Sequence, residues 1–153
     1  MYNEFSAATY SQVREVIVDL QHITGASIKP LVLYPMFLHY IEIDNGKLSN
    51  MSRTRVRDIV ETYCALCNEF YLINSKAKNP SYYFYMSKSR WDKYFLGEKA
   101  IKSSLSFLIK HNFISCEKRR NPNGINKVRL FSINLFMLKG LLLEAESNVK
   151  KRV

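Results

Sequence analysis

The sequence predicts a mainly helical fold with a small antiparallel β-sheet. Apolar residues recur at helical spacing over residues 52–70 and 98–111. A short aromatic run at 82–86 and an alternating, turn-interrupted segment at 114–130 instead have the composition of strands. With 153 residues, 47% of them hydrophobic, and only five glycines and four prolines, the chain suits one compact domain, or two very small ones that share a core.

Residues 1–46 are predicted to form an N-terminal helical extension. A helix expected over residues 9–24 has one apolar face, made of Val13, Val16, Ile17, Leu20 and Ile23. The stretch 29–43 is apolar almost all round, which predicts a buried helix that is kinked or divided at Pro35. The extension holds two basic and five acidic side chains, so it favours a scaffold or a partner-contact surface.

The central segment, residues 47–133, begins with a long helix expected over residues 52–70. Its apolar face is made of Val56, Ile59, Val60, Tyr63, Leu66, Cys67 and Phe70. A polar loop at 74–79 separates this helix from the aromatic strand at 82–86. We expect that strand to be the first strand of the small sheet.

Residues 87–133 are the core motif of the central segment. Trp91, Tyr94 and Phe95 fall at i, i+3 and i+4, which predicts a short helix, and Gly97 ends it because glycine adopts backbone angles that a helix interior does not. A second helix, over residues 98–111, is expected to bury one apolar stripe, made of Ile101, Leu105, Leu108 and Ile109. Its opposite face carries ammonium and hydroxyl groups, on Lys99, Lys102, Ser103, Ser106 and Lys110.

A basic β-hairpin is expected directly after this helix pair. Ile114 and Cys116 alternate with polar residues, a turn signal follows at 121–124, and Val128 and Leu130 then alternate with basic residues. We therefore expect a hairpin with one core face and one basic face. Two helices joined by a tight turn and followed by such a hairpin form a winged helix-turn-helix, whose second helix can face DNA.

A family resemblance points the same way. It is carried by Ser89, Arg90, Trp91, Tyr94, Phe95, Ile101, Leu105, Leu108, Phe113 and Ile114, and by the strand Leu130-Phe131-Ser132-Ile133-Asn134. This run resembles the winged-helix modules of phage and plasmid replication-initiation proteins and is similar to small mobile-element transcription regulators. The resemblance implies a non-enzymatic DNA-binding protein of a phage or plasmid, acting in replication initiation or transcription regulation.

The charge distribution favours double-stranded DNA as the partner. The net charge is +10, and residues 88–129 alone hold eleven basic and three acidic side chains, as a polyanion-binding segment would. The polar face of the helix at 98–111 is the predicted recognition surface; it lacks Arg, Asn and Gln, so phosphate contacts should dominate there. The predicted wing contacts are Lys118, Arg119, Arg120, Asn121, Asn123, Asn126, Lys127 and Arg129. The predicted flanking backbone contacts are Lys88, Arg90 and Lys93.

Two alternative interpretations stay open. A sequence echo at an offset of 42 residues aligns residues 59–80 with 101–122, which favours tandem winged helices, although chance recurrence of a helix, a strand and an Asn-Pro turn explains the same echo. In the tandem arrangement Arg53, Arg55 and Arg57 would extend the DNA-binding surface. The alternative function is a winged-helix protein-interaction module, such as a phage-encoded inhibitor or adaptor that docks on a host nucleoprotein complex.

Residues 134–153 are predicted to form a C-terminal helix and a basic tail, with Asn134 as the N-cap. Its many leucines cover more than one face of the helix. This excess favours either an interface, with a second copy of the chain or a host protein, or packing against the N-terminal extension.

The sequence carries no pattern typical of catalysis or of a cofactor site. Cys64 and Cys67 lie inside a helical pattern, far in sequence from Cys116 and the histidines, so we expect core packing and no metal. Phosphate-binding loops and nucleophile motifs are missing, and no small-molecule substrate is evident. Three cysteines without framework spacing, no long apolar run and no signal-like N-terminus favour a cytoplasmic protein outside the membrane.

Overall fold

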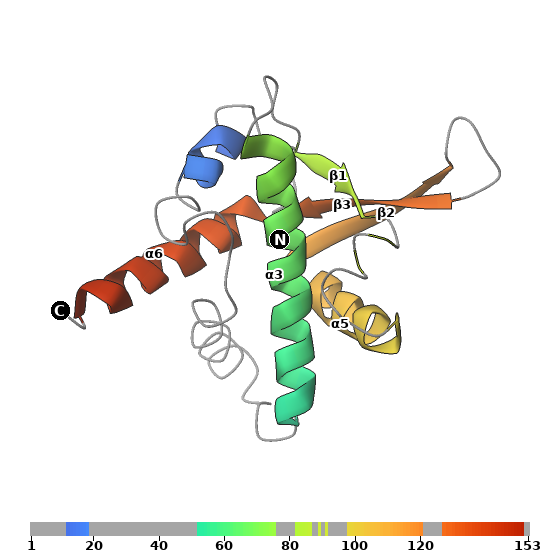
Figure 1. The fold of residues 1–153 in the computed structure, drawn as a ribbon, viewed down its shortest axis with the longest axis horizontal. Helices are drawn as coiled ribbons and strands as arrows, with labels where there is room; N and C mark the ends of the chain where they lie inside the picture. Colours follow the sequence, from blue (N-terminus) through green and yellow to red (C-terminus); the bar gives the residue numbers. More distant parts are fainter. Residues whose placement is uncertain are drawn as a thin grey trace.

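The computed structural model describes residues 12–18, 52–75, 82–86, 89, 91, 98–120 and 127–151. These residues form a mainly helical structure with a three-stranded antiparallel sheet, which confirms the predicted class (Figure 1). After a short helix at 12–18, the elements are α3 (Arg53–Ser75), β1 (Tyr83–Tyr85), α5 (Glu98–Lys110), β2 (Ile114–Arg120), β3 (Lys127–Ile133) and α6 (Leu135–Lys151).

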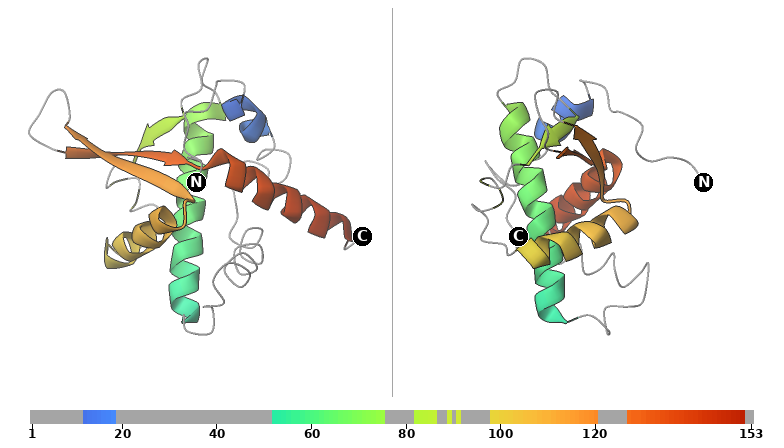
Figure 2. Two further views of the ribbon diagram at one scale, coloured as in Figure 1. Left: turned by 180° about the vertical axis from the view of Figure 1, so that it is seen from behind. Right: turned by 90° about the vertical axis from the view of Figure 1, so that its right-hand side faces the viewer.

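The long helix α3 runs through the middle of the fold, with α5 on one side of it and α6 on the other (Figures 1 and 2). All seven residues of its predicted apolar face are buried, as expected. Ser52 caps the helix, since its Oγ accepts a hydrogen bond from the backbone N–H of Arg55 at 3.1 Å. The helix continues to Ser75, beyond the predicted end, and near that end the buried amide of Asn74 donates to the carbonyl of Phe70 at 3.0 Å.

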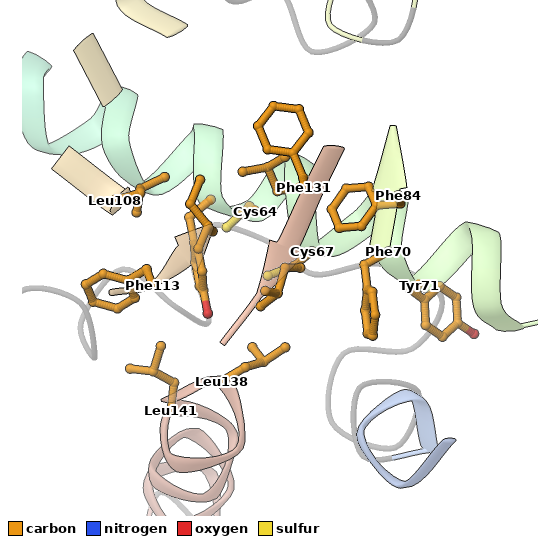
Figure 3. Close-up of a cluster of buried hydrophobic side chains, with 14 of the residues drawn as sticks. Cys64, Cys67, Phe70, Tyr71, Phe84, Leu108, Phe113, Phe131, Leu138 and Leu141 are labelled. Atoms are coloured by element: carbon orange, nitrogen blue, oxygen red, sulfur yellow. The ribbon is translucent and has the colours of Figure 1, made fainter. Parts of the chain in front are cut away.

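The sheet has the strand order β1-β3-β2, so the predicted aromatic strand does join the hairpin. Phe84 in β1 lies opposite Phe131 in β3, and its ring centroid is 6.1 Å from those of both Phe131 and Phe70. Trp91 also packs edge-on against Phe131, at 6.1 Å. The rings of Phe70, Phe84 and Phe131 form the contact between α3 and the sheet in the core (Figure 3).

A tight turn connects α5 to β2. Asn112 takes a left-handed backbone conformation, with φ of 63°. Its N–H donates to the carbonyl of Ile109 at 3.2 Å, and the N–H of Phe113 donates to that of Leu108 at 2.9 Å. This pair of bonds is the Schellman motif, which satisfies carbonyls that the helix end would leave without donors.

The start of α6 confirms the predicted cap. Asn134 is buried, and its Oδ1 accepts a hydrogen bond from the N–H of Met137 at 3.3 Å. On the helix at 12–18, Val13, Val16 and Ile17 are buried as predicted, and Glu15 forms an ion pair with Lys139 of α6. The rest of the predicted N-terminal helices, with Leu20, Ile23 and the stretch 29–43, lies outside the described residues.

One member of the stripe predicted for α5 is misplaced. Ile101, Leu105 and Leu108 are buried, but Ile109 is 42% exposed and Ser104 is buried instead. Positions 101, 104, 105 and 108 lie on one side of a helix that turns about 100° per residue, and position 109 falls at its edge.

The predicted division of the hairpin into a core face and a basic face is wrong. Across the ladder, Ile114 pairs with Ile133 and Cys116 with Phe131, so these residues share the core face. The two-residue period continues this same face through positions 118, 120, 127 and 129, all of them basic. Val128 and Leu130 belong to the opposite face, because pairing of the buried Ile114 with Ile133 sets a register that alternation alone does not specify.

The sequence echo holds for the helices and fails after them, since residues 59–68 of α3 and the aligned residues 101–110 of α5 are both helical. Residues 72–75 belong to the helix α3, whereas the aligned residues 114–117 belong to the strand β2.

Candidate nucleic-acid interface

The exposed face of α5 contains all five residues of the predicted recognition surface. Lys99, Lys102, Ser103, Ser106 and Lys110 are exposed. At about 100° per residue they fall within an arc of about 100°, on the side of the helix away from the buried Leu105 and Leu108. Three ammonium groups on one face can hold the phosphates of a polyanion. Their exposure is as expected, and their contact with DNA stays a prediction.

The two serines of this face are not equivalent. The Ser106 hydroxyl donates to the carbonyl of Lys102 within the helix, at 3.0 Å. This hydroxyl therefore has no proton left to donate, but its oxygen can still accept a hydrogen bond, for example from the amino group of a base. Ser103 is the better candidate to donate to a phosphate oxygen.

Arg55 fixes α5 against α3. Its guanidinium Nη2 donates to the backbone carbonyl of Ser103 at 3.0 Å, which joins residues 48 apart in sequence. Arg53 and Arg57 are exposed and lie two positions to either side of Arg55, so they point to roughly the opposite side of α3. The three arginines therefore do not extend the α5 face as one surface: Arg55 supports α5, and the other two are directed away from it.

The hairpin brings four basic positions together. Position 118 pairs with 129 and position 120 with 127, so Lys118, Arg129, Arg120 and Lys127 occupy one face. Arg119 pairs with Val128 on the other face. The predicted turn contacts Asn121, Asn123 and Asn126 lie outside the described residues.

The hairpin and α5 project from the same side of α3 (Figures 1 and 2). The core face of the sheet is turned to both helices, because Phe131 belongs to the same buried cluster as Tyr63 of α3 and Leu108 of α5. The four basic positions continue that face beyond the core. The predicted flanking contacts, Lys88, Arg90 and Lys93, lie outside the described residues.

The cysteine pair belongs to the core. Cys64 and Cys67 are buried with free thiols, beside Phe70 and Leu138 in the cluster of Figure 3. Burial raises the pKa of both thiols, so they stay protonated and poorly reactive near neutral pH. Within the part of the chain that the structure describes, no group of three or more His, Cys, Asp or Glu side chains is placed to hold a metal ion.

The sequence analysis missed two structural features of this region. The contact of Arg55 with Ser103 depends on the packing of two helices and leaves no local signal. Asn112, by contrast, could have been found, since asparagine after a helical stripe is a recognised signal for a left-handed C-terminal cap.

Comparison of the chain with protein-family models, with curated proteins and with solved structures finds no match. Among the described residues, no helix combines the length and the apolar character needed to cross a membrane.

Proposed function

We propose that this chain is a non-enzymatic winged-helix DNA-binding protein of a phage or plasmid, acting in replication initiation or transcription regulation. The element order supports the winged-helix assignment. The helix α3 and the strand β1 come first, followed by the helical residues Ser89 and Trp91. The helix α5 and the hairpin of β2 and β3 come next, and β3 also pairs with β1. The biological role rests on the resemblance in sequence, and the DNA contact rests on the surface.

The observation that carries the proposal is the distribution of cations. Three lysines share the exposed face of α5, and the register gathers four basic positions on one face of the hairpin. Both project from one side of α3. Such a surface fits the phosphate backbone of a duplex, with α5 in or along the major groove.

The test is the salt dependence of duplex binding. Each phosphate contact contributes about 0.9 to the log–log slope of affinity against salt, so Lys99→Ala, Lys102→Ala and Lys110→Ala together should make the slope shallower by about 2 to 3 and weaken binding to all sequences. Fluorescence anisotropy with a labelled duplex at several salt concentrations measures both quantities.

The matched control is Arg53→Ala with Arg57→Ala, which removes charge from the side of α3 away from α5. This control should leave the slope unchanged. An equal loss in both variants would mean that only net charge matters, and no binding by the wild-type chain would favour the alternative, a winged-helix module that binds protein.

A further inference from the structure

The side chain of Arg55 brings a positive charge from α3 to the exposed face of α5. Its guanidinium Nη2 donates to the backbone carbonyl of Ser103, and within the part of the chain that the structure describes this is the only hydrogen bond of the guanidinium. A guanidinium has five N–H donors in one plane, so most of its donors remain available to another acceptor. Arg55 is half-buried, and among the described residues no carboxylate forms an ion pair with it.

The hydroxyl of Ser103 is a second donor at the same place. The hydroxyl and carbonyl oxygens of a serine are each two bonds from its Cα, so the bond from Arg55 brings the guanidinium close to the hydroxyl. Ser103 is exposed, and within the described residues its hydroxyl makes no hydrogen bond, whereas that of Ser106 donates to Lys102. A charged donor from α3 and a neutral donor from α5 therefore lie together at the surface.

We propose that Arg55 and Ser103 together bind one phosphate of the DNA backbone at the junction of α3 and α5. The planar donors of arginine match the oxygens of a phosphate, and a phosphate can accept from a hydroxyl at the same time. Arg55 also lies in the first turn of α3, where the helix dipole favours a nearby anion. The exposed lysines of α5 continue this surface, which favours a polynucleotide over an isolated anion.

This inference rests on the proposed function and deepens it, because it assigns a phosphate contact to a residue of α3. The test is a double-mutant cycle on duplex binding by the full chain, measured by fluorescence anisotropy at several salt concentrations. Ser103→Ala should weaken binding about three- to tenfold without changing the log–log slope of affinity against salt, since a hydroxyl carries no charge. Arg55→Ala should weaken binding and make that slope shallower by about 1.

Coupling between the two residues is the decisive quantity. If both donors bind the same phosphate, the loss of affinity in Arg55→Ala with Ser103→Ala should be at least about threefold smaller than the product of the two single losses. Ser106→Ala is the matched control, because it removes a hydroxyl from the same face, and its effect should simply multiply with that of Arg55→Ala. An arginine that only held α5 in place would couple equally to both serines.

Two further variants separate charge from geometry. Arg53→Ala removes the same charge from the other side of α3 and should leave the slope unchanged. Arg55→Lys keeps the charge but not the planar donors, so it should keep the slope and still lose affinity. Thermal unfolding of each variant shows whether the fold is retained.

The outcomes distinguish this inference from the proposed function. No duplex binding by the wild-type chain would overturn both. Duplex binding in which Arg55→Ala leaves the slope unchanged, or in which Arg55 couples to neither serine or equally to both, would overturn the inference alone. If Arg55→Ala does not fold, Ser103→Ala still decides, because it changes an exposed helical position to a good helix former, and an unchanged affinity would overturn the inference.

Discussion

Asn134 joins three elements through one buried side chain and its backbone. Its Oδ1 caps α6, and its amide Nδ2 donates to the carbonyl of Asn112 at 2.8 Å, at the end of α5. Its own N–H donates to the carbonyl of Phe113 at 2.9 Å, beside the end of β3. The relative positions of α5, the sheet and α6 therefore depend on this residue.

Replacing Asn134 should destabilise the fold by a predictable amount. Loss of an N-cap costs about 0.5–2 kcal/mol, and loss of the part-buried hydrogen bond to the carbonyl of Asn112 costs about 0.5–1.5 kcal/mol. Asn134→Ala should therefore lower the free energy of unfolding by about 1–3 kcal/mol. Asn134→Ser keeps a cap acceptor and loses only the amide, so it should cost about half as much. Urea unfolding measures both, and equal losses in the two variants would show that the cap contributes little.

At the scale of elements, the hairpin places basic residues opposite each other at its outer end. Position 118 pairs with 129, and position 120 with 127. Directly opposed like charges destabilise a sheet by up to about 1 kcal/mol for each pair. From this register we expect the hairpin to be less stable in the free protein than its length alone would allow.

Lys118→Glu separates stability from binding. The change places a carboxylate opposite position 129, so thermal unfolding of the free protein should show a free energy of unfolding higher by about 0.2–1 kcal/mol. The affinity for a duplex should fall, and the log–log slope of affinity against salt should become shallower by about 1. Arg119→Glu is the control, because Arg119 pairs with Val128 on the other face and should give no gain in stability. A gain in stability with unchanged binding would exclude this hairpin face from the duplex.

Most of the elements could be predicted from sequence because their signals are local. The apolar stripe of α3, the aromatic strand and the cap at Asn134 depend on residues within a few positions of one another. The hairpin register could not be predicted, since alternation gives the period of a strand but not its offset against a partner. The Arg55–Ser103 contact spans 48 positions, and the exposure of Ile109 depends on which neighbours α5 packs against.

At the scale of the whole molecule, the cationic face of α5 is separate from α6. The helices α5 and α6 lie on opposite sides of α3 (Figure 1). The lysines of α5 are therefore not covered by α6 and stay exposed.

The buried ionisable groups of the core should make the folded protein less stable at alkaline pH. Tyr63, Cys64 and Cys67 are buried within little more than one turn of α3. Burial is the main cause that raises the pKa of all three groups. These groups have higher pKa values in the folded state than in the unfolded state. Their contribution to the free energy of unfolding is therefore complete below about pH 8.5, the thiol pKa in the unfolded chain, and it is lost as the pH rises above that value.

The free energy of unfolding should therefore fall between about pH 8.5 and 10. Each thiol that ionises only in the unfolded state contributes a limiting slope of about 1.4 kcal/mol per pH unit, so two of them approach about 2.7. Cys64→Ala with Cys67→Ala should flatten this dependence, although it lowers stability at neutral pH by removing packed atoms. Urea unfolding in reducing buffer at a series of pH values measures the slope. A wild-type slope that matches that of the double variant would show that these thiols ionise as readily in the folded protein as in the unfolded one, and that α3 is more accessible to water than its burial indicates.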